Sequence, residues 1–334
     1  YEEAVADRVD RWSADVLVPV TEASLHALLP ARSRFRGAIM PFPEHSVFRA
    51  VCDKSAVMRE ARELGIAVPR QRVIEGPGAV ELDGDLDYPV VVKPSRSVVS
   101  SSSGSRKTSV VHAADRREVQ SVVDSLPSVA FPALVQERVV GPGIGVFLLL
   151  WDGELLAAFG HRRLREKPPS GGVSVLRESV SLESDLLQAS RQLLDRFGWR
   201  GVAMVEYKRD RRTGVPYLME VNGRFWGSLQ LAVDAGVDFP RLLIEAATGG
   251  DPEPVTDYST GVRTRWLLGD VDHLLLRLRR SADELSLSED APGRTEAVLD
   301  FLSAFGPGSR SEVWRWSDPV PGLREMAAWL RGQG

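Results

Sequence analysis

Two glutamates in the segment "GVAMVEYKRDRRTGVPYLMEVN" have the types and the spacing to hold a metal ion. Glu206 lies in "VAMVEYK" and Glu220 in "YLMEVN", and a polar turn at residues 211–214 separates these two apolar segments. Both glutamates lie at a similar distance along the chain from that turn, so a β-hairpin places them almost opposite each other. Two opposed carboxylates repel unless a cation lies between them.

Asn222 completes a set of oxygen ligands, because residues two apart on a strand share a face and it follows Glu220 at that spacing. Two carboxylates and an amide oxygen suit Mg²⁺ that also holds substrate phosphates. The spacing therefore predicts a metal site. The alternative is a pair of glutamates at the rim of a sheet, each neutralised by Lys208 or Arg224.

A lysine at the end of another apolar segment could bind phosphate. Lys93 ends "YPVVVKP" and precedes the small, polar stretch "RSVVSSSSGSRKTSV", which predicts a strand followed by a mobile loop. Backbone N–H groups and hydroxyls of such a loop can meet a polyphosphate, with the lysine as a point charge. Alternatively, Lys93 is a strand-end lysine whose apolar stem is buried beneath a disordered linker.

Periodicity and capping residues predict the elements that position these groups. Helices are expected over residues 1–14, 21–31, 47–65, 113–126, 181–198, 228–235, 239–248, 270–280, 294–305 and 321–332. Strands are expected over residues 15–20, 37–43, 87–95, 133–140 and 261–268, with hairpins over 145–164 and 201–222. Residues 166–174 are expected to form a loop.

Composition narrows the class of protein. The 334 residues suggest two or three domains, and 43% hydrophobic with 26% charged residues is typical of a soluble globular protein. A net charge of −4 argues against general nucleic-acid binding, and no apolar run approaches a membrane span. The single cysteine, Cys52, excludes an internal disulfide and fits a reducing, cytoplasmic compartment. We expect Cys52 to fill the core rather than to act as a nucleophile.

From about Lys54 to Gly250 the chain resembles the ATP-grasp superfamily, in particular its ADP-forming carboxylate–amine ligases. It is also similar to the ATP-grasp domains of carbamoyl-phosphate synthase and biotin carboxylase. The resemblance rests on the order of the segments "DKSAVMREARELGIAVP", "YPVVVKP", a small-residue loop, "LVQERVVG", "HRRLRE", "GG", "VEYK" and "MEVNGRFWGS".

The resemblance implies an α/β chain with the α+β ATP-grasp fold, in which two α+β subdomains clasp ATP. An incomplete Rossmann-like layer would precede them and a small α/β segment would follow. The implied domains are residues 1–52, 53–133, 134–250 and 251–334. Either this first layer is a trimmed version of a nucleotide-binding fold, or the strands that it lacks lie upstream of Tyr1.

The resemblance also implies roles for single residues. Mg²⁺, or Mn²⁺ in its place, would be held by Glu206, Glu220 and Asn222, and Arg224 and Lys93 would be catalytic. ATP would be bound by Lys54, Lys93, Ser102, Ser103, Gly104 and the hinge residues Gln136, Glu137, Arg138 and Val139. The substrate would meet His161, Arg163, Arg165, Gly171, Gly172 and Trp226. The segment "GPGIGV" offers no acid for the ribose.

The implied activity is an ATP-dependent ligase that joins a carboxylate to an amine through an acylphosphate and releases ADP and phosphate. Small-molecule substrates are expected, with no nucleic acid or membrane as partner, and a homodimer is one assembly open to the chain. The alternatives are a bicarbonate-activating enzyme and a regulatory protein that binds ATP without turnover. Residues 251–334 carry no assigned motif, and we expect Arg263 and Arg265 there to be surface charge rather than part of the cleft.

Overall fold

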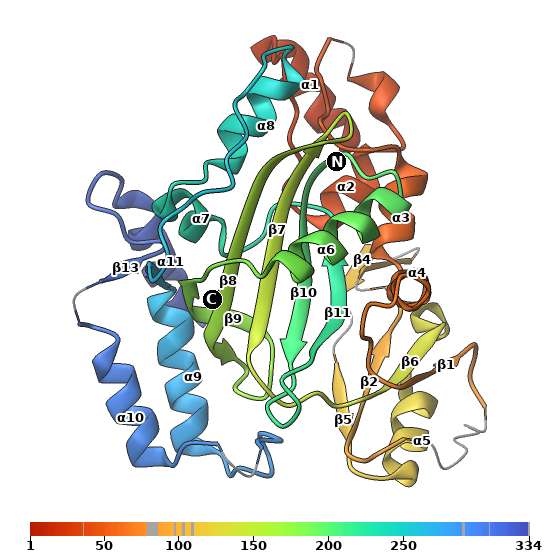
Figure 1. Ribbon diagram of the computed structural model, residues 1–334, viewed down its shortest axis with the longest axis vertical. Helices are drawn as coiled ribbons and strands as arrows, with labels where there is room; N and C mark the ends of the chain where they lie inside the picture. Colours follow the sequence, from red (N-terminus) through yellow and green to blue (C-terminus); the bar gives the residue numbers. More distant parts are fainter. Residues whose placement is uncertain are drawn as a thin grey trace.

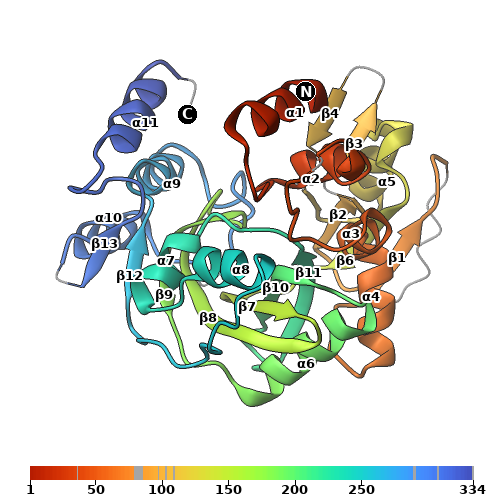
Figure 2. The same ribbon diagram turned by 90° about the horizontal axis from the view of Figure 1, so that it is seen from above.

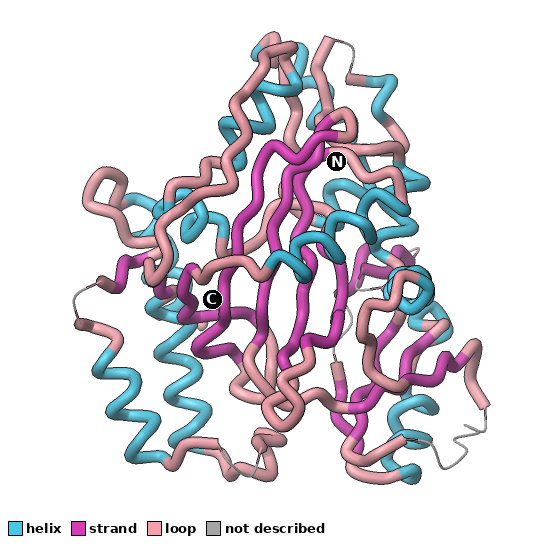
Figure 3. The backbone as a smooth tube through the Cα atoms, viewed as in Figure 1, coloured by secondary structure: helices cyan, strands magenta, loops and turns pink. Residues whose placement is uncertain are grey.

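The structure is a computed structural model that describes residues 1–35, 37–78, 86–96, 98–101, 104–107, 110–288, 291–306 and 308–332. Two largely antiparallel sheets, one of four strands and one of seven, form its framework. Helices cover these sheets and extend from both ends of the chain (Figures 1 and 3). This mixture of helices and antiparallel sheets is the α+β class that the sequence predicted.

The N-terminal region contains helices rather than a sheet layer. Helices α1 (Glu2–Trp12) and α2 (Glu22–Leu28) are followed by the short 3₁₀ helix η1 (Arg32–Arg34). The strands predicted over 15–20 and 37–43 are wrong, because in this part of the described chain they reduce to one parallel bridge between Val16 and Ile39. Prolines in both segments remove backbone donors that a longer ladder would need.

The single long helix predicted over residues 47–65 is two helices, α3 (His45–Cys52) and α4 (Lys54–Glu63). Asp53 breaks the helix with extended backbone, and its carboxylate accepts hydrogen bonds from the backbone N–H groups of Ser55 and Ala56. An aspartate at this position caps the second helix. The break places Lys54 in the first turn of α4.

The four-stranded sheet has the order β1 (Gln71–Ile74), β6 (Ala133–Glu137), β2 (Val90–Pro94), β5 (Val111–Ala113). The helix α5 (Arg116–Ser125) packs on this sheet through its valines and a short 3₁₀ helix, η2 (Ser128–Ala130), follows it. The serine-rich stretch, predicted as a mobile loop, instead has the strands β3 (Val98–Ser101) and β4 (Gly104–Lys107), which pair antiparallel.

The seven-stranded sheet has the order β11 (Pro216–Asn222), β10 (Gly201–Arg209), β7 (Gly143–Trp151), β8 (Glu154–Lys167), β9 (Val173–Ser179), β12 (Arg263–Arg265), β13 (Ser309–Ser311). The helices α6 (Ser184–Arg196), α7 (Leu229–Ala235) and α8 (Phe239–Ala247) pack against it (Figures 1 and 2). Strand β9 was not predicted, because its charged Arg177 and Glu178 hide the apolar pattern of a buried strand.

The C-terminal residues continue this sheet through β12, which pairs with β9, and then form the helices α9 (Leu267–Arg279), α10 (Arg294–Ser303) and α11 (Val320–Leu330). The surface placement predicted for Arg265 is wrong, because the residue is buried and its Nε donates to Asp270 at 2.6 Å. Arg263 is exposed, as expected, and pairs with Glu178. The predicted domain boundaries stay predictions.

Across the described residues, no helix has both the length and the apolar character that a membrane span requires.

We predict that Gly223→Ala destabilises the fold. A Cβ at Gly223 would lie 2.2 Å from Cη2 of Trp199, a side chain that is itself buried in the core. Overpacking of this kind costs about 1–3 kcal/mol of unfolding free energy. Thermal and urea unfolding should therefore show a lower melting temperature and midpoint than in the unsubstituted protein.

Gly227→Ala is the matched control, because a Cβ there meets no atom within 4 Å. Equal melting temperatures for the two variants would contradict the close contact between Gly223 and Trp199.

Candidate functional site

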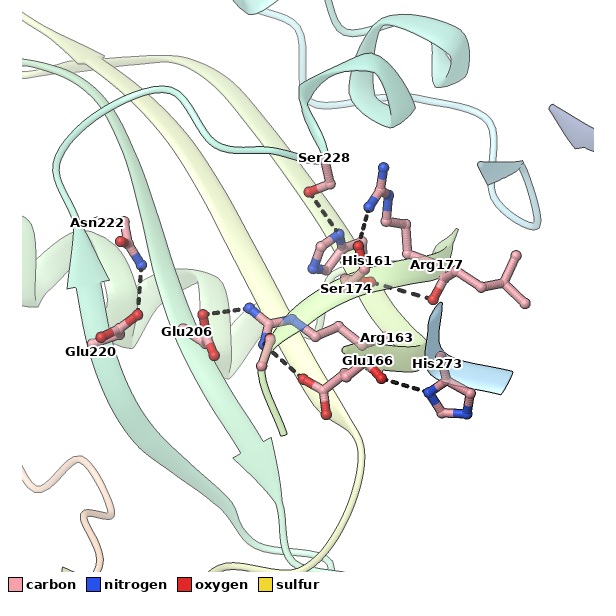
Figure 4. A network of polar contacts seen from close by, with 12 residues as sticks. His161, Arg163, Glu166, Ser174, Arg177, Glu206, Glu220, Asn222, Ser228 and His273 are labelled. Atoms are coloured by element: carbon pink, nitrogen blue, oxygen red, sulfur yellow. Dashed lines mark hydrogen bonds and ion pairs between the residues drawn. The ribbon is translucent and has the colours of Figure 1, made fainter. Parts of the chain in front are cut away.

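The two glutamates of the β10–β11 hairpin lie opposite each other. The strand register pairs Glu206 with Glu220 directly, and an irregularity in the ladder follows immediately after Glu206. This is the arrangement that the position of the turn predicted. Figure 4 shows both carboxylates on neighbouring strands, with Asn222 beside Glu220. The local sequence thus brings two negative charges together at the edge of the larger sheet.

Glu206 is held by an arginine from strand β8. Arg163 Nη2 lies 2.5 Å from Glu206 Oε2, and its Nη1 donates to Glu166 Oε1 at 2.9 Å and to the carbonyl oxygen of Gly172 at 3.1 Å (Figure 4). Burial raises the pKa of Glu206, and the nearby Glu220 raises it further, against the lowering effect of Arg163. Removing either partner of this partly buried pair would leave a charge poorly neutralised.

Glu220 is held from the other side by Lys54 of helix α4. Lys54 Nζ lies 3.1 Å from Glu220 Oε2, and Asn222 Nδ2 donates to Glu220 Oε1 at the same distance. Burial opposes ionisation of Glu220, but Lys54 and Lys93 outweigh it and lower the pKa of this carboxyl to about 2. The two glutamates therefore have pKa values shifted in opposite directions.

The cations that contact the two glutamates differ from those named in the alternative interpretation, a pair of glutamates at the rim of a sheet. Within the described part of the chain, Arg163 pairs with Glu206 and Lys54 pairs with Glu220. Neither Lys208 nor Arg224 forms an ion pair with these glutamates there. Arg224 instead donates to Asn222 Oδ1 at 2.9 Å and to the carbonyl oxygen of Phe225 at 2.8 Å. Arg224 therefore stays next to the cluster, in contact with one of its predicted ligands.

Lys93 reaches the same cluster from the smaller sheet. Its side chain is buried near the end of β2, and its Nζ donates a hydrogen bond to Gln136 Oε1 at 2.8 Å. Gln136 in turn donates from Nε2 to Gln71 Oε1, also at 2.8 Å. Desolvation is the main cause that lowers the pKa of Lys93 to about 8, and repulsion from Lys54 adds to it. The buried stem and the inward ammonium are those expected from the sequence.

The other described residues that were predicted to bind ATP lie mostly in the segment that connects the two sheets. Glu137 accepts from Arg70 at 2.6 Å and from the backbone N–H of Asp87 at 2.8 Å. Arg138 donates to the carbonyl oxygen of Ser286 at 2.5 Å, and Val139 is buried. Of the loop residues, Gly104 begins β4, whereas Ser102 and Ser103 lie outside the described residues.

A cavity of about 260 Å³ lies between this connection, the end of β8 and the C-terminal helices. Its lining is rich in charged side chains: Arg138, Arg163, Arg165, Glu166, Lys208, Arg211, Arg277 and Asp300. Arg163 belongs both to the cavity wall and to the pair with Glu206. The cavity therefore opens next to the carboxylate hairpin and presents mostly positive charge to an occupant.

Of the residues predicted to meet substrate, Arg163 and Arg165 line this cavity, but they have different partners. Arg163 lies at the hairpin, but Arg165 donates through Nε and Nη2 to the buried Asp270, at 2.7 Å each. Gly171 has φ +132°, and a Cβ on Gly172 would lie 2.4 Å from the carbonyl oxygen of Lys167. These two glycines shape the turn that joins β8 to β9.

His161 and Trp226 lie in the core. His161 is 1% exposed, Phe147 meets its ring edge-on at 4.7 Å between centroids, and its Nδ1 lies 3.3 Å from Ser228 Oγ. Burial, followed by repulsion from Arg163, lowers the pKa of His161 well below its usual value. Trp226 packs on Phe147 and Phe239 at 6% exposure. Both side chains pack among core aromatic rings, and the direct substrate contact predicted for both stays a prediction.

Sequence reasoning missed the anions that orient the arginines. Glu166, Asp270 and Glu312 hold Arg163, Arg165 and Arg177 respectively, and the last pair joins β9 to the segment after β13. Only Glu166 carried a local signal, since it follows Arg163 by three residues. The other two lie more than a hundred residues away from their partners along the chain.

Taken together, two lysines, one arginine and two opposed carboxylates surround one point between the sheets. Oxygen ligands of this kind suit a hard divalent cation, and lysines suit the oxygens of phosphate groups. The arrangement can therefore bind a metal–polyphosphate complex and neutralise its charge. It contains no paired nucleophile and base among the described residues, so its chemistry would be positioning and charge stabilisation.

The comparisons with known proteins agree with this geometry. Residues 130–269 match the family described as "ATP-grasp in the biosynthetic pathway with Ter operon", which is less than half of the chain. No curated protein matches the chain in sequence.

Several solved structures have a similar fold. The L-amino acid ligase from Bacillus licheniformis is similar over 75% of this chain and 61% of its own, with 19% identity and a TM-score of 0.58. A biotin carboxylase from Campylobacter jejuni, bound to an ATP analogue, covers 78% and 60%, with 14% identity and a TM-score of 0.63. The chain spans about 60% of the length of these two proteins, and the likeness establishes the fold.

We predict that Lys93 loses its proton near pH 8. Nitrogen-detected NMR of lysine side chains measures this midpoint. Glu220→Gln should lower it further, because removing a nearby negative charge destabilises the ammonium form. Between pH 8 and about 10.5 the unfolded chain would hold a proton that the folded chain lacks, so this group makes stability rise with pH in that window.

Glu178→Gln is the control for this titration, since Glu178 pairs with Arg162 and Arg263 away from the hairpin. A Lys93 midpoint at 10 or above would contradict the buried environment.

Proposed function

Because this chain has the ATP-grasp fold, we propose that it is an ATP-dependent ligase that joins a carboxylate to an amine. In the first step a carboxylate oxygen attacks the γ-phosphorus, and the bond from that phosphorus to the β–γ bridging oxygen breaks. The products are an acylphosphate and ADP. The amine nitrogen then attacks the acyl carbon, phosphate leaves, and a proton from the amine passes to solvent.

The observation that carries this proposal is the direct pairing of Glu206 with Glu220 beside Lys54 and Lys93. Opposed carboxylates cost free energy, and a site that bound only apolar or neutral ligands would have no need of them. Their position between two sheets of an ATP-grasp fold supports a role at the phosphate end of ATP.

The residues present fit Mg²⁺. Glu206 and Glu220 offer carboxylate oxygens from adjacent strands. Asn222 lies beside Glu220 with its Nδ2 toward that carboxylate and its Oδ1 toward Arg224, so its amide would flip to offer the oxygen to the metal. Mn²⁺ accepts similar oxygen ligands. When bound, the metal would neutralise charge on the phosphates and hold them for in-line transfer.

The chain's own groups would act as follows. Lys54 and Lys93 would bind phosphate oxygens, and the ammonium of Lys93 would be kept charged by the phosphates despite its burial. Arg224, held by Asn222, would face the transferred phosphoryl group and the carboxylate. Arg163 would keep Glu206 in place, and the part of its side chain that lines the cavity would face the substrate. No covalent enzyme intermediate is needed, because positioning lowers the barrier.

The cationic cavity favours an acidic substrate, such as an amino acid or a short peptide with free carboxylates. Arg138, Lys208 and Arg211 line it, together with the arginine that holds Glu206. Likeness to a protein described as an L-amino acid ligase is consistent with this substrate class. The substrate pair stays part of the proposal.

A second candidate is activation of bicarbonate, which the similarity to biotin carboxylase structures favours. One of these similar structures is described with MgADP and bicarbonate, at 15% identity and a TM-score of 0.59. Bicarbonate would replace the organic carboxylate in the first step. ADP release that depends on bicarbonate and needs no organic acid would identify this activity.

We predict that ADP release, screened over carboxylate and amine pairs with mass detection of the product, depends on Mg²⁺ and falls at least about 10²-fold in Glu220→Gln. The variant keeps the shape of the side chain and removes the charge that pairs with Lys54. Lys93→Met should weaken ATP binding, as measured by calorimetry with Mg²⁺ present.

Glu178→Gln serves as the control, because its carboxylate lies outside the hairpin and pairs with Arg162 and Arg263. Full activity of Glu220→Gln would remove the metal role, and unchanged ATP affinity of Lys93→Met would remove Lys93 from the phosphate site. Mg²⁺-dependent ATP binding without turnover over the whole screen would favour the regulatory alternative.

A further inference from the structure

A second group of metal-binding side chains lies in the helical N-terminal region, outside the carboxylate hairpin. Glu22 and His26 come from helix α2 and Cys52 ends helix α3, and one ligand atom from each lies within 4.8 Å of the others. Glu22 and His26 are four residues apart and so share one face of their helix. Helix packing then places the only thiol of the chain against that face.

The orientation of His26 suits a ligand. Its Nε2 faces Glu22 Oε1 at 3.9 Å, while its Nδ1 lies 3.5 Å from Nε2 of His45. The edge contact with Phe48, at 4.9 Å between ring centroids, limits rotation of the imidazole. A histidine that ligates a metal through one nitrogen typically donates its other N–H to a neighbouring acceptor. His45 stands where that acceptor is needed.

The access to this cluster also suits an ion. The side chains of His26 and Glu22 are 17% and 14% exposed, whereas Cys52 is buried in the core. A cation can thus enter from the side of α2 and meet the sulfur last. Ligands about 2.0–2.3 Å from a tetrahedral ion lie about 3.3–3.8 Å apart. The cluster would therefore contract by about 1 Å on binding, which side-chain rotation can supply.

We propose that Glu22, His26 and Cys52 form a binding site for a zinc-class divalent cation, separate from the Mg²⁺ site of the hairpin. A thiolate, an imidazole and a carboxylate together select Zn²⁺ over the hard Mg²⁺. The thiol proton of Cys52 leaves to solvent as the sulfur–metal bond forms. Three protein ligands leave a fourth position for water.

The location gives the site a structural consequence. Cys52 is followed by Asp53, which caps α4, and then by Lys54, whose ammonium holds Glu220. A cation bound to Cys52 would tie helix α2 to the junction between α3 and α4. It would thereby hold the helix start that presents Lys54, without being a ligand of the nucleotide. The site is independent of the ligase proposal, because it rests on other residues.

The test uses the full chain, freed of metal and titrated with Co²⁺ and then Zn²⁺. We expect thiolate-to-metal charge-transfer absorption that saturates at one thiolate-bound Co²⁺ per chain, displacement of that Co²⁺ by Zn²⁺, and a higher melting temperature with Zn²⁺ present. Cys52→Ser should abolish the charge-transfer absorption, and His26→Gln should weaken Zn²⁺ binding in competition with a chromophoric chelator. His45→Ala should weaken it about 10–100-fold, as expected for a residue that orients a ligand.

His112→Ala is the matched control, since this half-buried histidine lies on β5 and should leave Zn²⁺ affinity unchanged. Glu220→Gln should also retain the Co²⁺ spectrum, which separates this site from the hairpin. Absence of charge-transfer absorption in the unsubstituted protein would overturn the proposal by itself, whether or not the variants fold. Zn²⁺ affinity unchanged in both Cys52→Ser and His26→Gln, with circular dichroism showing folded protein, would overturn it as well.

Discussion

The repulsion between Glu206 and Glu220 is the constraint around which the two sheets are arranged. The ladder of the hairpin leaves these carboxylates no alternative positions, because they face each other in register. Two like charges at paired positions of adjacent strands are tolerated when each has its own cation. Arg163 and Lys54 supply those cations from opposite sides, and the resulting pKa shifts have opposite signs. Ligand binding would therefore replace charge compensation that the protein already provides.

The cations come from three separate segments of the chain. Lys54 starts helix α4, Arg163 lies on β8 of the larger sheet, and Lys93 ends β2 of the smaller sheet. Each is positioned by a local feature, namely the cap at Asp53, the pairing of β8 with β9, and the buried valines of β2. Buried charges of this kind do not add much stability, but they penalise arrangements that separate them. The carboxylate pair thus ties helix α4 and strand β8 to the hairpin, and Lys93 adds an electrostatic attraction from the smaller sheet.

How much of this the sequence could predict depends on the distance over which each interaction acts. The pairing of Glu206 with Glu220 was predictable because one short turn sets the register of a hairpin. Gly223 follows Asn222 directly and so falls on the opposite face from Glu220 and Asn222, where Trp199 fills the space. By contrast, the break between α3 and α4 depends on the capping interaction of Asp53, which the helical pattern of the sequence does not show. Strand β9 contains buried charged residues, and such residues in a sequence usually indicate an exposed segment. The partner of Arg165 could not be inferred, because tertiary packing alone brings Asp270 to it.

That last contact changes what the arginines of β8 can do. Alternate positions on this strand carry Arg163 and Arg165, which on sequence alone are equivalent candidates for an anionic substrate. The C-terminal segment supplies Asp270, which is fully buried and accepts from both Arg165 and Arg265. A guanidinium held by two hydrogen bonds to a buried carboxylate has little left to offer a ligand. Residues beyond 250 therefore neutralise Arg165 at the wall of the cavity, in the way that Glu206 and Glu166 neutralise Arg163.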